Sequence, residues 1–573
     1  KRWQSVRENN LSFINKLYLC ALFPNIIAVL GGTVNVLFDG ILVGRRLGDA
    51  GLAGVNQSFP VYLILCALGA LVASGAAQLS AMAVGENRKQ DSIRIFRCAV
   101  LLGSVMSAAV CLILLAFSQP LAELLSSGEN SDYVRTYIQI TLIGGIFKVM
   151  LYIPYFYLRL EGRNVQAMRI MLIMTAINIV LDYIFLFVCD FGIAGAAWAS
   201  VTATAAACIL GFIYLAADSG DFYIGFSFPR RDEFVGIARY GVMMSFNNIL
   251  SAVRIFALNK VLWIFGAGEF TAVFAVVNSI AEFSMCIQNG VPQASGAMMG
   301  IFAGERDSAA IKKLLHTQLM CGSLLSAAVA ALLIVFAGGI GGIFGSNADS
   351  AAAICCFAAS LVFATINNVF SYYYNATGNV WLANISFLFR VCIFAVGFCY
   401  MFGELNLMVW LFFPAAEIAT MMLCLSAGSI KAEKMKLNPF YLIDDSLEKS
   451  GRSIAMSVEA EQDKICEASE KIQEFCEANN MPPKTAMVIS LAAEEIMMII
   501  SEKSLKAGGS IDVRVLNGDD AGVLRIRSGG EKYNPLAAQD ESDEYMGIRM
   551  ITGLAKNIDY QSALGVNTLT VII

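Results

Sequence analysis

Long apolar runs, each bounded by glycine, proline or charged residues, follow one another along the first three quarters of the chain. Twelve of them are long enough to cross a bilayer as helices. They cover residues 18–45, 52–84, 93–117, 133–159, 164–189, 193–217, 236–265, 270–303, 312–345, 350–376, 380–402 and 406–428. The pattern therefore predicts an all-α polytopic membrane protein with twelve transmembrane helices.

The pattern changes after residue 430. Residues 431–449 are expected to form a polar linker, and residues 450–573 have the spacing of a small soluble α+β domain. The elements predicted in it are helices at 462–478 and about 484–501, a hairpin at 511–527 and a closing strand at 568–573. We expect this domain to lie outside the membrane.

The apolar part of the chain repeats itself. The segment RLGDAGLAGVNQSFP from Arg46 has an echo in GAGEFTAVFAVVNS after Phe265, at an offset of about 220 residues. Six helices in residues 1–220 are thus followed by six related helices in residues 221–430. Two parallel six-helix lobes are typical of alternating-access transporters, with a site between or within the lobes.

Composition and charge narrow the class further. Of the 573 residues, 57% are hydrophobic and only 15% are charged, as in a membrane protein. The 15 Cys form no C-x-x-C motif and one His is present, so we expect no zinc site and no cofactor. The chain has no basic stripe of the kind that binds nucleic acid, so we expect no nucleic-acid partner. Basic residues gather in alternate loops, which by the positive-inside rule places both termini in the cytoplasm of a cell-membrane protein.

Acidic and polar residues inside the first lobe are the strongest functional signal. Asp182 lies within an apolar span, with Asn178 one turn earlier on the same face. Asp39 and Ser200 fall at a similar depth, roughly 10 Å below the outer surface at 1.5 Å per residue. Two carboxylates, an amide and a hydroxyl could hold Na⁺ or trap a proton. The alternative is a structural hydrogen-bond network.

The second lobe has a different set of polar residues. Asn259 takes the place of Asp39 in the repeat. Charged residues at mid-membrane depth are Arg254, Glu282, Arg390 and Glu417. We expect them to pair with one another, either along a substrate path or as supports of the lobe. The aromatic run 372–374 is interpreted as an interfacial anchor, with stacking on a flat substrate as the alternative.

Several motifs resemble one transporter family. They are N-x-x-x-D-Y at 178–183, F-G-I-x-G-A-A-x-A at 191–199, P-x14-D-x4-G-x3-G from Pro24 to Gly48, and YLRLEGR at 157–163. Together they resemble the multidrug and toxic compound extrusion (MATE) exporters. The resemblance implies a two-lobe fold and a cation-coupling role for Asp39, Asn178 and Asp182, with Ser200 where the family often has Thr.

The last domain resembles the Bergerat-type (GHKL) ATPase domain of histidine kinases and anti-sigma-factor serine kinases. Its nucleotide motifs are degenerate. Glu495 is followed by Ile499 where the family has a magnesium-binding Asn, Ser528 replaces the adenine-reading Asp, and the glycine hinge is reduced to Tyr545, Met546 and Gly547. We expect a regulatory or partner-binding module without kinase activity or micromolar binding of Mg-ATP.

These observations favour a transporter rather than an enzyme. The leading hypothesis is a Na⁺- or H⁺-coupled antiporter of the multidrug-efflux type that exports small organic, amphipathic compounds. Its expected partners are the substrate, membrane lipid and a cytosolic protein that binds the C-terminal domain. Two alternatives are a flippase for a lipid-linked precursor and a membrane sensor that signals through the C-terminal domain.

Overall fold

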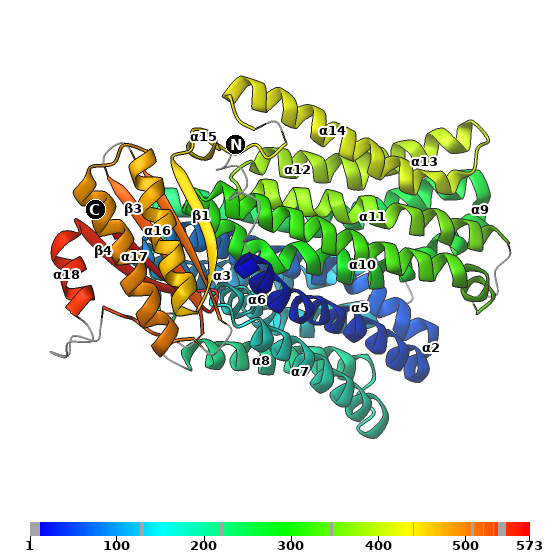
Figure 1. Ribbon diagram of the computed structural model, residues 1–573. Helices are drawn as coiled ribbons and strands as arrows, with labels where there is room; N and C mark the ends of the chain where they lie inside the picture. The colour runs from blue at the N-terminus through cyan, green and yellow to red at the C-terminus, as the bar shows by residue number, and fades with distance from the viewer. Residues whose placement is uncertain are drawn as a thin grey trace.

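A computed structural model describes residues 12–126, 131–217, 222–343, 348–438, 440–505, 509–518, 521–530, 532–536 and 546–573. Long helices form a bundle, and a small α+β domain lies against one end of it (Figure 1). We call this end the docked end and the opposite one the far end. The described part of the chain has eleven helical segments that are long and apolar enough to span a membrane, and a bent pair of helices makes a twelfth. The chain is therefore a multi-pass membrane protein, as its apolar runs predict.

Two helices of 74 residues frame the bundle, α2 (Ser12–Gly85) and α9 (Arg231–Gly304). Each contains two membrane spans. Within α2 the backbone leaves the helical region at Gly48, where φ is 64° and ψ is −159°, a conformation that glycine adopts at little cost. The equal lengths and the offset of 219 residues between their starts agree with the internal repeat in the sequence.

The other helices follow the same two-part order. In the first half they are α3 (Lys89–Ala116), α4 (Ser118–Leu125), α5 (Ser131–Ile143), α6 (Gly145–Leu160), α7 (Asn164–Tyr183), the π-helix η1 (Ile184–Val188) and α8 (Gly192–Ala216). In the second half they are α10 (Ser308–Ile343), α11 (Ala348–Ala376), α12 (Val380–Leu388), the π-helix η2 (Phe389–Phe394), α13 (Ala395–Glu404), the short η3 (Val409–Leu411) and α14 (Phe412–Met435).

The predicted span 133–159 is not one straight helix. Helices α5 and α6 are bent by 49° at the pair Gly144 and Gly145. Adjacent glycines weaken a helix, and kinks occur at such pairs. Gly144 also lies tight against α8, since a Cβ atom there would be 2.3 Å from the Val201 side chain. The apolar pattern predicted the span but not its bend.

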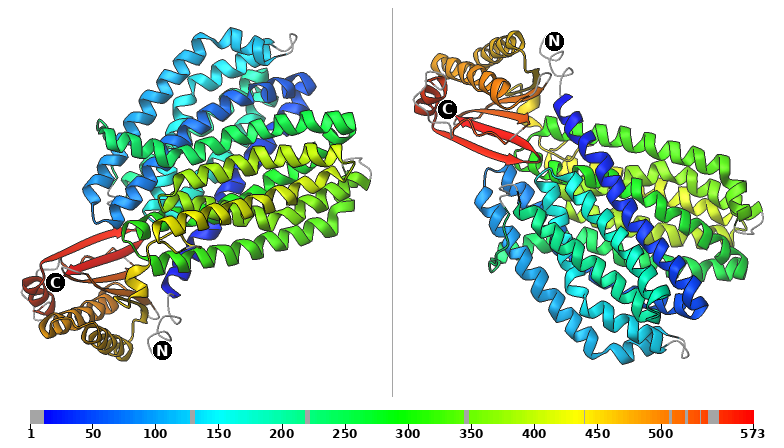
Figure 2. Two further views of the ribbon diagram at one scale, coloured as in Figure 1. Left: turned by 90° about the horizontal axis from the view of Figure 1, so that it is seen from above. Right: turned by 90° about the horizontal axis from the view of Figure 1, so that it is seen from below.

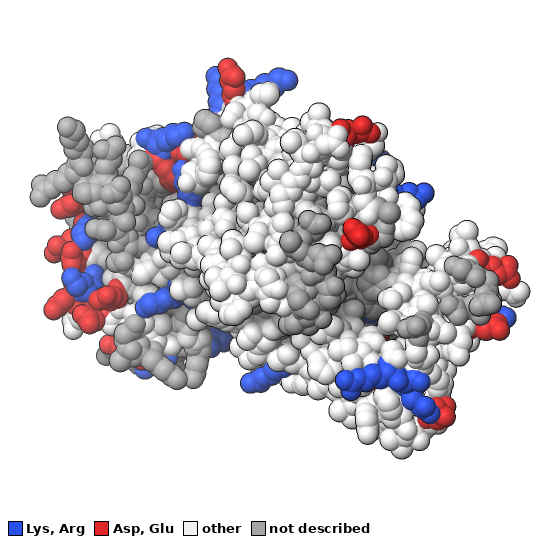
Figure 3. All heavy atoms as spheres, turned by 90° about the vertical axis from the view of Figure 1, so that its right-hand side faces the viewer, with Lys and Arg blue, Asp and Glu red and all other residues white. Residues whose placement is uncertain are grey.

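The two lobes lie side by side and touch closely in their docked halves (Figure 2). A Cβ atom on Gly75, Gly85 or Gly241 would come within 2.1 Å of a backbone oxygen on the facing lobe. Larger residues at these positions would push the lobes apart. Toward the far end the helices diverge (Figure 2), and a view of that end shows a recess between the lobes (Figure 3). The bundle is thus closed at the docked end.

The C-terminal domain is a five-stranded antiparallel sheet with strand order β1-β2-β3-β5-β4. The strands are β1 (Ser453–Glu459), β2 (Ser510–Asn517), β3 (Gly522–Gly529), β4 (Asn557–Ala563) and β5 (Val566–Ile572), and the helices are α15 (Ser446–Lys449), α16 (Gln462–Ala478), α17 (Pro483–Lys503) and α18 (Met546–Leu554). The predicted helices, hairpin and closing strand are confirmed. Strands β1 and β4 were not among the elements expected.

Strands β2 and β3 are buried on both faces of the sheet. Successive side chains of a strand point to opposite faces. Ile511 and Val513 belong to the apolar core that includes residues of α16 and α17. The alternate residues Asp512, Arg514 and Arg527 are charged and at most 3% exposed, because they face the helical bundle.

Candidate functional site

The four residues predicted for the first-lobe site come from three helices and converge. Asn178 and Asp182 lie one turn apart on α7 and are 1% and 0% exposed. The Nδ2 of Asn178 donates a hydrogen bond to the Oγ of Ser200 on α8, at 3.3 Å. Asp39 on α2 is half-buried and close enough to Asp182 for their charges to interact.

Four buried oxygen atoms of this cluster lack protein partners. Both carboxylate oxygens of Asp182 and the Oδ1 atoms of Asp39 and Asn178 are buried without a hydrogen bond. Such atoms are costly in the bilayer interior. Oxygen is the ligand type that Na⁺ requires, and a proton would neutralise one of the acids. The residues therefore fit a bound cation, held by two carboxylates with amide and hydroxyl support.

Two features of this cluster were missed from the sequence. Tyr137 on α5 lies beside both acids and interacts with Ser200, but its surroundings in the sequence are ordinary for a span. The π-helix η1 begins two residues after Asp182. A π-helical turn widens the helix locally and is frequent at functional sites. The acid thus lies where α7 departs from regular geometry.

In the second lobe, Arg390 and Glu417 form an ion pair. The Nε of Arg390, within η2, is 2.9 Å from both carboxylate oxygens of Glu417. Asn368 accepts a hydrogen bond from the Arg390 Nη1 at 2.6 Å. Asn367 donates to the Glu417 Oε2 at 2.8 Å. These partners satisfy most of the polar atoms of the pair.

The other second-lobe residues are less tightly held. Arg254 is close enough to Arg390, Glu282 and Glu417 for electrostatic interaction. Its Nε is buried without a hydrogen bond. Asn259 is partly buried on α9 and makes no hydrogen bond among the described contacts. The structure therefore brings four of the five predicted residues into one charged group, with Asn259 outside it.

A cavity of about 270 Å³ lies between the two lobes. Its lining includes Asn35, Tyr62, Lys148, Tyr152, Tyr155, Phe156, Asn247, Asn248, Asn289, Gln293 and Tyr372. Of these, only Tyr372 was considered as a substrate contact from the sequence, as the alternative to an interfacial anchor. Lys148 was detectable, since it lies in the middle of an apolar run.

The interpretation of run 372–374 as an interfacial anchor was wrong. Tyr372 lines the cavity, whereas Tyr373 and Tyr374 are 1% and 2% exposed inside the protein. The hydroxyl of Tyr373 donates to the carbonyl of Tyr441 at 2.5 Å. Helix α11 packs against α9, α10, α12 and α14, so its tyrosines face protein rather than the membrane surface.

Solved structures with the same arrangement are known. A MATE protein in complex with MaL6 superposes with a TM-score of 0.69 at 23% identity, covering 75% of this chain and 98% of that one. A MOP-superfamily transporter from Pyrococcus furiosus, whose binding pocket is described as having reverse polarity, gives 0.69 at 22% identity over 76% and 98%. The helical bundle has the MATE fold.

Sequence comparisons agree over part of the chain. A model of the MatE family matches residues 24–184. The multidrug export protein MepA of Staphylococcus aureus (strain NCTC 8325 / PS 47) is 24% identical over 248 residues, which are 43% of this chain and 54% of MepA. MepA of Staphylococcus saprophyticus is 23% identical over 274 residues, or 47% and 59%. The chain thus matches little more than half the length of these curated relatives.

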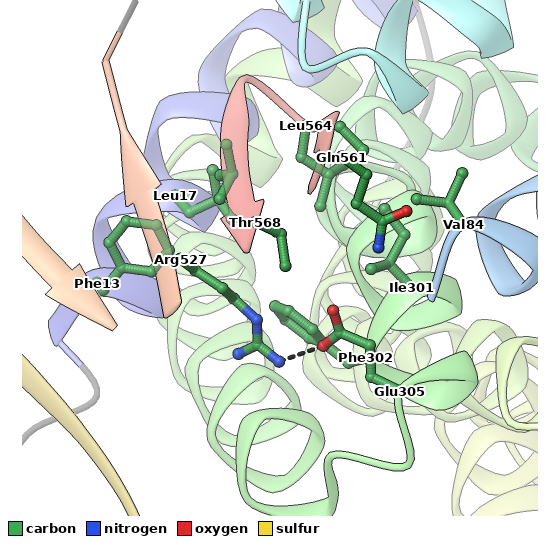
Figure 4. Close-up of a pocket in the computed structure, with 12 residues that line it drawn as sticks. Phe13, Leu17, Val84, Ile301, Phe302, Glu305, Arg527, Gln561, Leu564 and Thr568 are labelled. Carbon is green, nitrogen blue, oxygen red and sulfur yellow. Dashed lines mark hydrogen bonds and ion pairs between the residues drawn. The ribbon is translucent and has the colours of Figure 1, made fainter. Parts of the chain in front are cut away.

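The C-terminal domain docks on the MATE-fold bundle through buried ion pairs. Arg527 of β3 pairs with Glu305, just after α9 (Figure 4). The Arg527 Nη2 is also 2.7 Å from the Asp307 Oδ2. Its Nη1 is 2.8 Å from Asp512 on β2. The guanidinium also lies over the Phe302 ring, 5.0 Å from the centroid. All four ionic groups are at most 6% exposed.

The ionic groups of this cluster lie outside the membrane-spanning segments. Burial favours a raised pKa for Asp307, but Arg514 and Arg527 outweigh it and hold the pKa below its usual range. Burial raises the pKa of Asp512 to about 6, against the lowering effect of Arg527. Asp307 of the bundle is thus held ionised, whereas Asp512 of the domain is protonated more easily.

The same domain also contacts the first lobe. The backbone N–H of Leu564 donates to the carbonyl of Leu160, at the end of α6, at 2.9 Å. The Nε2 of Gln561 on β4 donates to the Oδ1 of Asn87, between α2 and α3, at 2.8 Å. Because Arg527 binds the second lobe, one rigid sheet joins the docked ends of both lobes.

The residues matched to a nucleotide site do not form an open polar pocket. Glu495 on α17 is exposed, and Ile499, one turn later, is 6% exposed. Ser528 is fully buried within β3, and its Oγ has no hydrogen-bond partner. Gly547 belongs to α18. Tyr545, also part of the expected hinge, lies outside the described residues.

Proposed function

We propose that this protein is a secondary active exporter of small organic compounds, driven by inward flux of Na⁺ or H⁺. The observation that carries the proposal is the cluster of unpartnered buried oxygens at Asp39, Asn178 and Asp182. A cation or proton bound there would remove a large electrostatic cost. Its binding and release would then bias the equilibrium between two arrangements of the lobes.

The central cavity supports an exporter over a lipid flippase. It is compact, lies between the lobes and carries amide and tyrosine groups. A flippase for a lipid-linked precursor would need a long apolar groove for the lipid chain. The MepA relatives are named as multidrug export proteins, which agrees with export of organic compounds.

The docked end is assigned to the cytoplasm. Loops at this end carry Arg88 and Lys89 before and at the start of α3, Arg230 and Arg231 at the start of α9, and Arg306 after it. Positive residues in short loops favour the cytoplasmic side. With this orientation, closure at the docked end corresponds to a cavity that faces outward.

The direct test is flux in proteoliposomes that contain the purified full chain. An imposed Na⁺ or H⁺ gradient should drive uphill movement of fluorescent organic compounds in the opposite direction, and collapse of the gradient should stop it. A sensor that signals through its C-terminal domain would bind ligand without gradient-driven flux. Absence of flux with both ions, in vesicles that contain folded protein, would contradict the proposal.

We also propose that the C-terminal domain, a relative of the kinase-type ATPase fold that has lost its nucleotide chemistry, regulates export. It contacts Asn87 and Leu160 of the first lobe and Glu305 and Asp307 of the second. Opening toward the cytoplasm requires the docked ends to separate. A domain that joins them would hold the outward-facing state, and a cytosolic partner that removes it would raise the export rate.

A reversible cross-link across the docking contact tests this role without disturbing the ion cluster. In the chain with Asn87→Cys and Gln561→Cys, the two thiols replace the ends of a 2.8 Å side-chain contact and are joined by a short bis-methanethiosulfonate, because Cys is too short for a direct disulfide to be assumed. Cross-linking should stop export, and a reductant should restore it. The single change Gln561→Cys serves as the matched control for reaction of the native thiols. Full export by the cross-linked chain would show that the domain need not move.

A further inference from the structure

An unpaired cation in the central cavity is not explained by the cation-coupled cycle. Lys148 lies on α6, a few residues after the bend at Gly144. Its Nζ donates to the Tyr62 hydroxyl at 2.8 Å and lies 4.5 Å from the centroid of that ring. Cys66 is its other electrostatic neighbour. Among the described residues no carboxylate interacts with Lys148.

The acids of the bundle interior are engaged elsewhere. Asp39 and Asp182 lie together in the first lobe. In the second lobe, Glu417 is bound by Arg390 and Glu282 interacts with Arg254. The described lining of the cavity contains no Asp or Glu. A positive charge without a nearby counter-ion is costly in the low-dielectric interior of a membrane protein.

A second cation lies at the docked side of the same cavity. Arg159 is 5% exposed, and its Nη1 donates to the Oε1 of Gln293 at 3.2 Å. The guanidinium also lies over the rings of Tyr155 and Phe156, 5.2 and 5.5 Å from their centroids. Gln293 and both rings line the cavity. Lys148 in the cavity wall and Arg159 beside it are thus two cationic groups next to a described lining without a carboxylate.

We propose that the cavity binds a small aromatic anion, with its carboxylate, sulfonate or phosphate on Lys148. An ammonium has three N–H donors, and the contact with Tyr62 uses one of them. The aromatic part of the ligand would pack among Tyr152, Tyr155 and Tyr372. An organic cation of the same size would meet the Lys148 charge with no acid to offset it. This inference rests on the proposed exporter role and names its substrate class.

Two probes of opposite charge and similar shape test the inference, 2-naphthoate and trimethyl-2-naphthylammonium. Equilibrium binding to the purified full chain in detergent should favour naphthoate. Lys148→Met should weaken naphthoate binding at least about tenfold, because it removes a charge-assisted hydrogen bond, and Lys148→Arg should largely keep it. Lys260→Met, which removes a lysine of α9 outside the cavity, should change nothing.

Tighter binding of the cationic probe, or unchanged naphthoate affinity in a folded Lys148→Met chain, would overturn the inference. Should that variant fail to fold, the preference of the unmodified chain between the two probes still decides. Binding is measured without any ion gradient, so the two proposals can fail separately. Naphthoate binding without gradient-driven flux would remove the exporter role and keep the anion site. Gradient-driven flux of the cationic probe alone would keep the exporter role and remove the anion site.

Discussion

The two lobes share one duplicated helical plan but treat buried charge in opposite ways. In the first lobe, the Asp182 carboxylate has both oxygens buried without a partner. In the second, Arg390 and Glu417 form a 2.9 Å pair with amide support from Asn367 and Asn368. An unpartnered acid can exchange a cation or proton, whereas a satisfied pair has little to gain from one. Under the proposed function, the first lobe would carry ion coupling and the ion pair of the second lobe would give structural support.

Both charged groups lie beside a π-helical turn. Asp182 comes two residues before η1, and Arg390 lies within η2. A π-helical turn interrupts the regular α-helical hydrogen bonding, and such turns are frequent at functional sites. The difference between the lobes therefore comes from the residue types at these places and from their partners.

The largest effect is expected at the unpartnered acids. Asp182→Asn keeps the size of the side chain and removes its charge, so coupled export should fall to the level of empty vesicles while the protein remains folded. Asp39→Asn should act in the same way. The measurement is gradient-driven flux at matched amounts of protein, with melting temperature as the check on folding. Normal flux in both variants would end the assignment of coupling to the first lobe.

Substitution of the ion pair in the second lobe should lower protein stability more than it lowers transport. Arg390→Ala would leave Glu417 buried without its ion partner, which costs about 3–5 kcal/mol. Its melting temperature should fall clearly below that of the unmodified chain. The double change Arg390→Met with Glu417→Met removes both charges and should recover most of that loss. A normal melting temperature in Arg390→Ala would refute a structural pair and favour a role in the substrate path.

The ion cluster under the C-terminal domain provides a third case, with a modest pH dependence. The pKa of Asp512 is raised to about 6 by burial, so the docked state holds its proton more tightly than a free domain. Docking should therefore weaken as pH rises from about 4 to about 6, by about 3 kcal/mol at most. Asp307, whose pKa is lowered, adds stability that is lost only in more acidic solution.

The readout for this pH effect is the rate at which the bis-methanethiosulfonate joins the two thiols of the chain that carries Asn87→Cys and Gln561→Cys, scaled to the reactivity of a free thiol at each pH. The scaled rate should decline from about pH 4 to about pH 6 and stay level above that when the chain carries no other change. Adding Asp512→Asn should flatten the profile, because it removes the titrating group. A steeper profile with Asp512→Asn would show that another group controls docking.

The sequence predicted the parts of the molecule that depend on chain order and depth. Apolar runs indicated the spans, and depth counting placed Asp39, Asn178, Asp182 and Ser200 at one level, where the structure gathers them. Tyr137 could not be found in this way, since a tyrosine in a span is common and only the packing of α5 brings it to the acids. Local pattern also carries no information about which helices face one another.

The central cavity also shows that local sequence pattern does not reveal which helices pack together. Tyr372 was assigned to the membrane interface from its neighbours in the sequence, but it lines the cavity because α11 packs inside the second lobe. The buried arginines of the C-terminal sheet are another example. Alternation along β3 predicts that Arg525 and Arg527 share a face, yet only the docked bundle explains why that face is buried.

The smallest effect on export is expected from addition of Mg-ATP. Mg²⁺ requires oxygen ligands, and the apolar Ile499 follows Glu495 where a second ligand would be needed. Ser528 is enclosed in the sheet with 0% exposure, so it cannot read an adenine ring without opening the domain. Calorimetry of the full chain with Mg-ATP should therefore detect no binding in the micromolar range, and ATP should leave export unchanged. The matched control is Ile499→Asn, which restores one family ligand. Saturable micromolar binding by the unmodified chain would contradict this prediction and make ATP the ligand that controls docking.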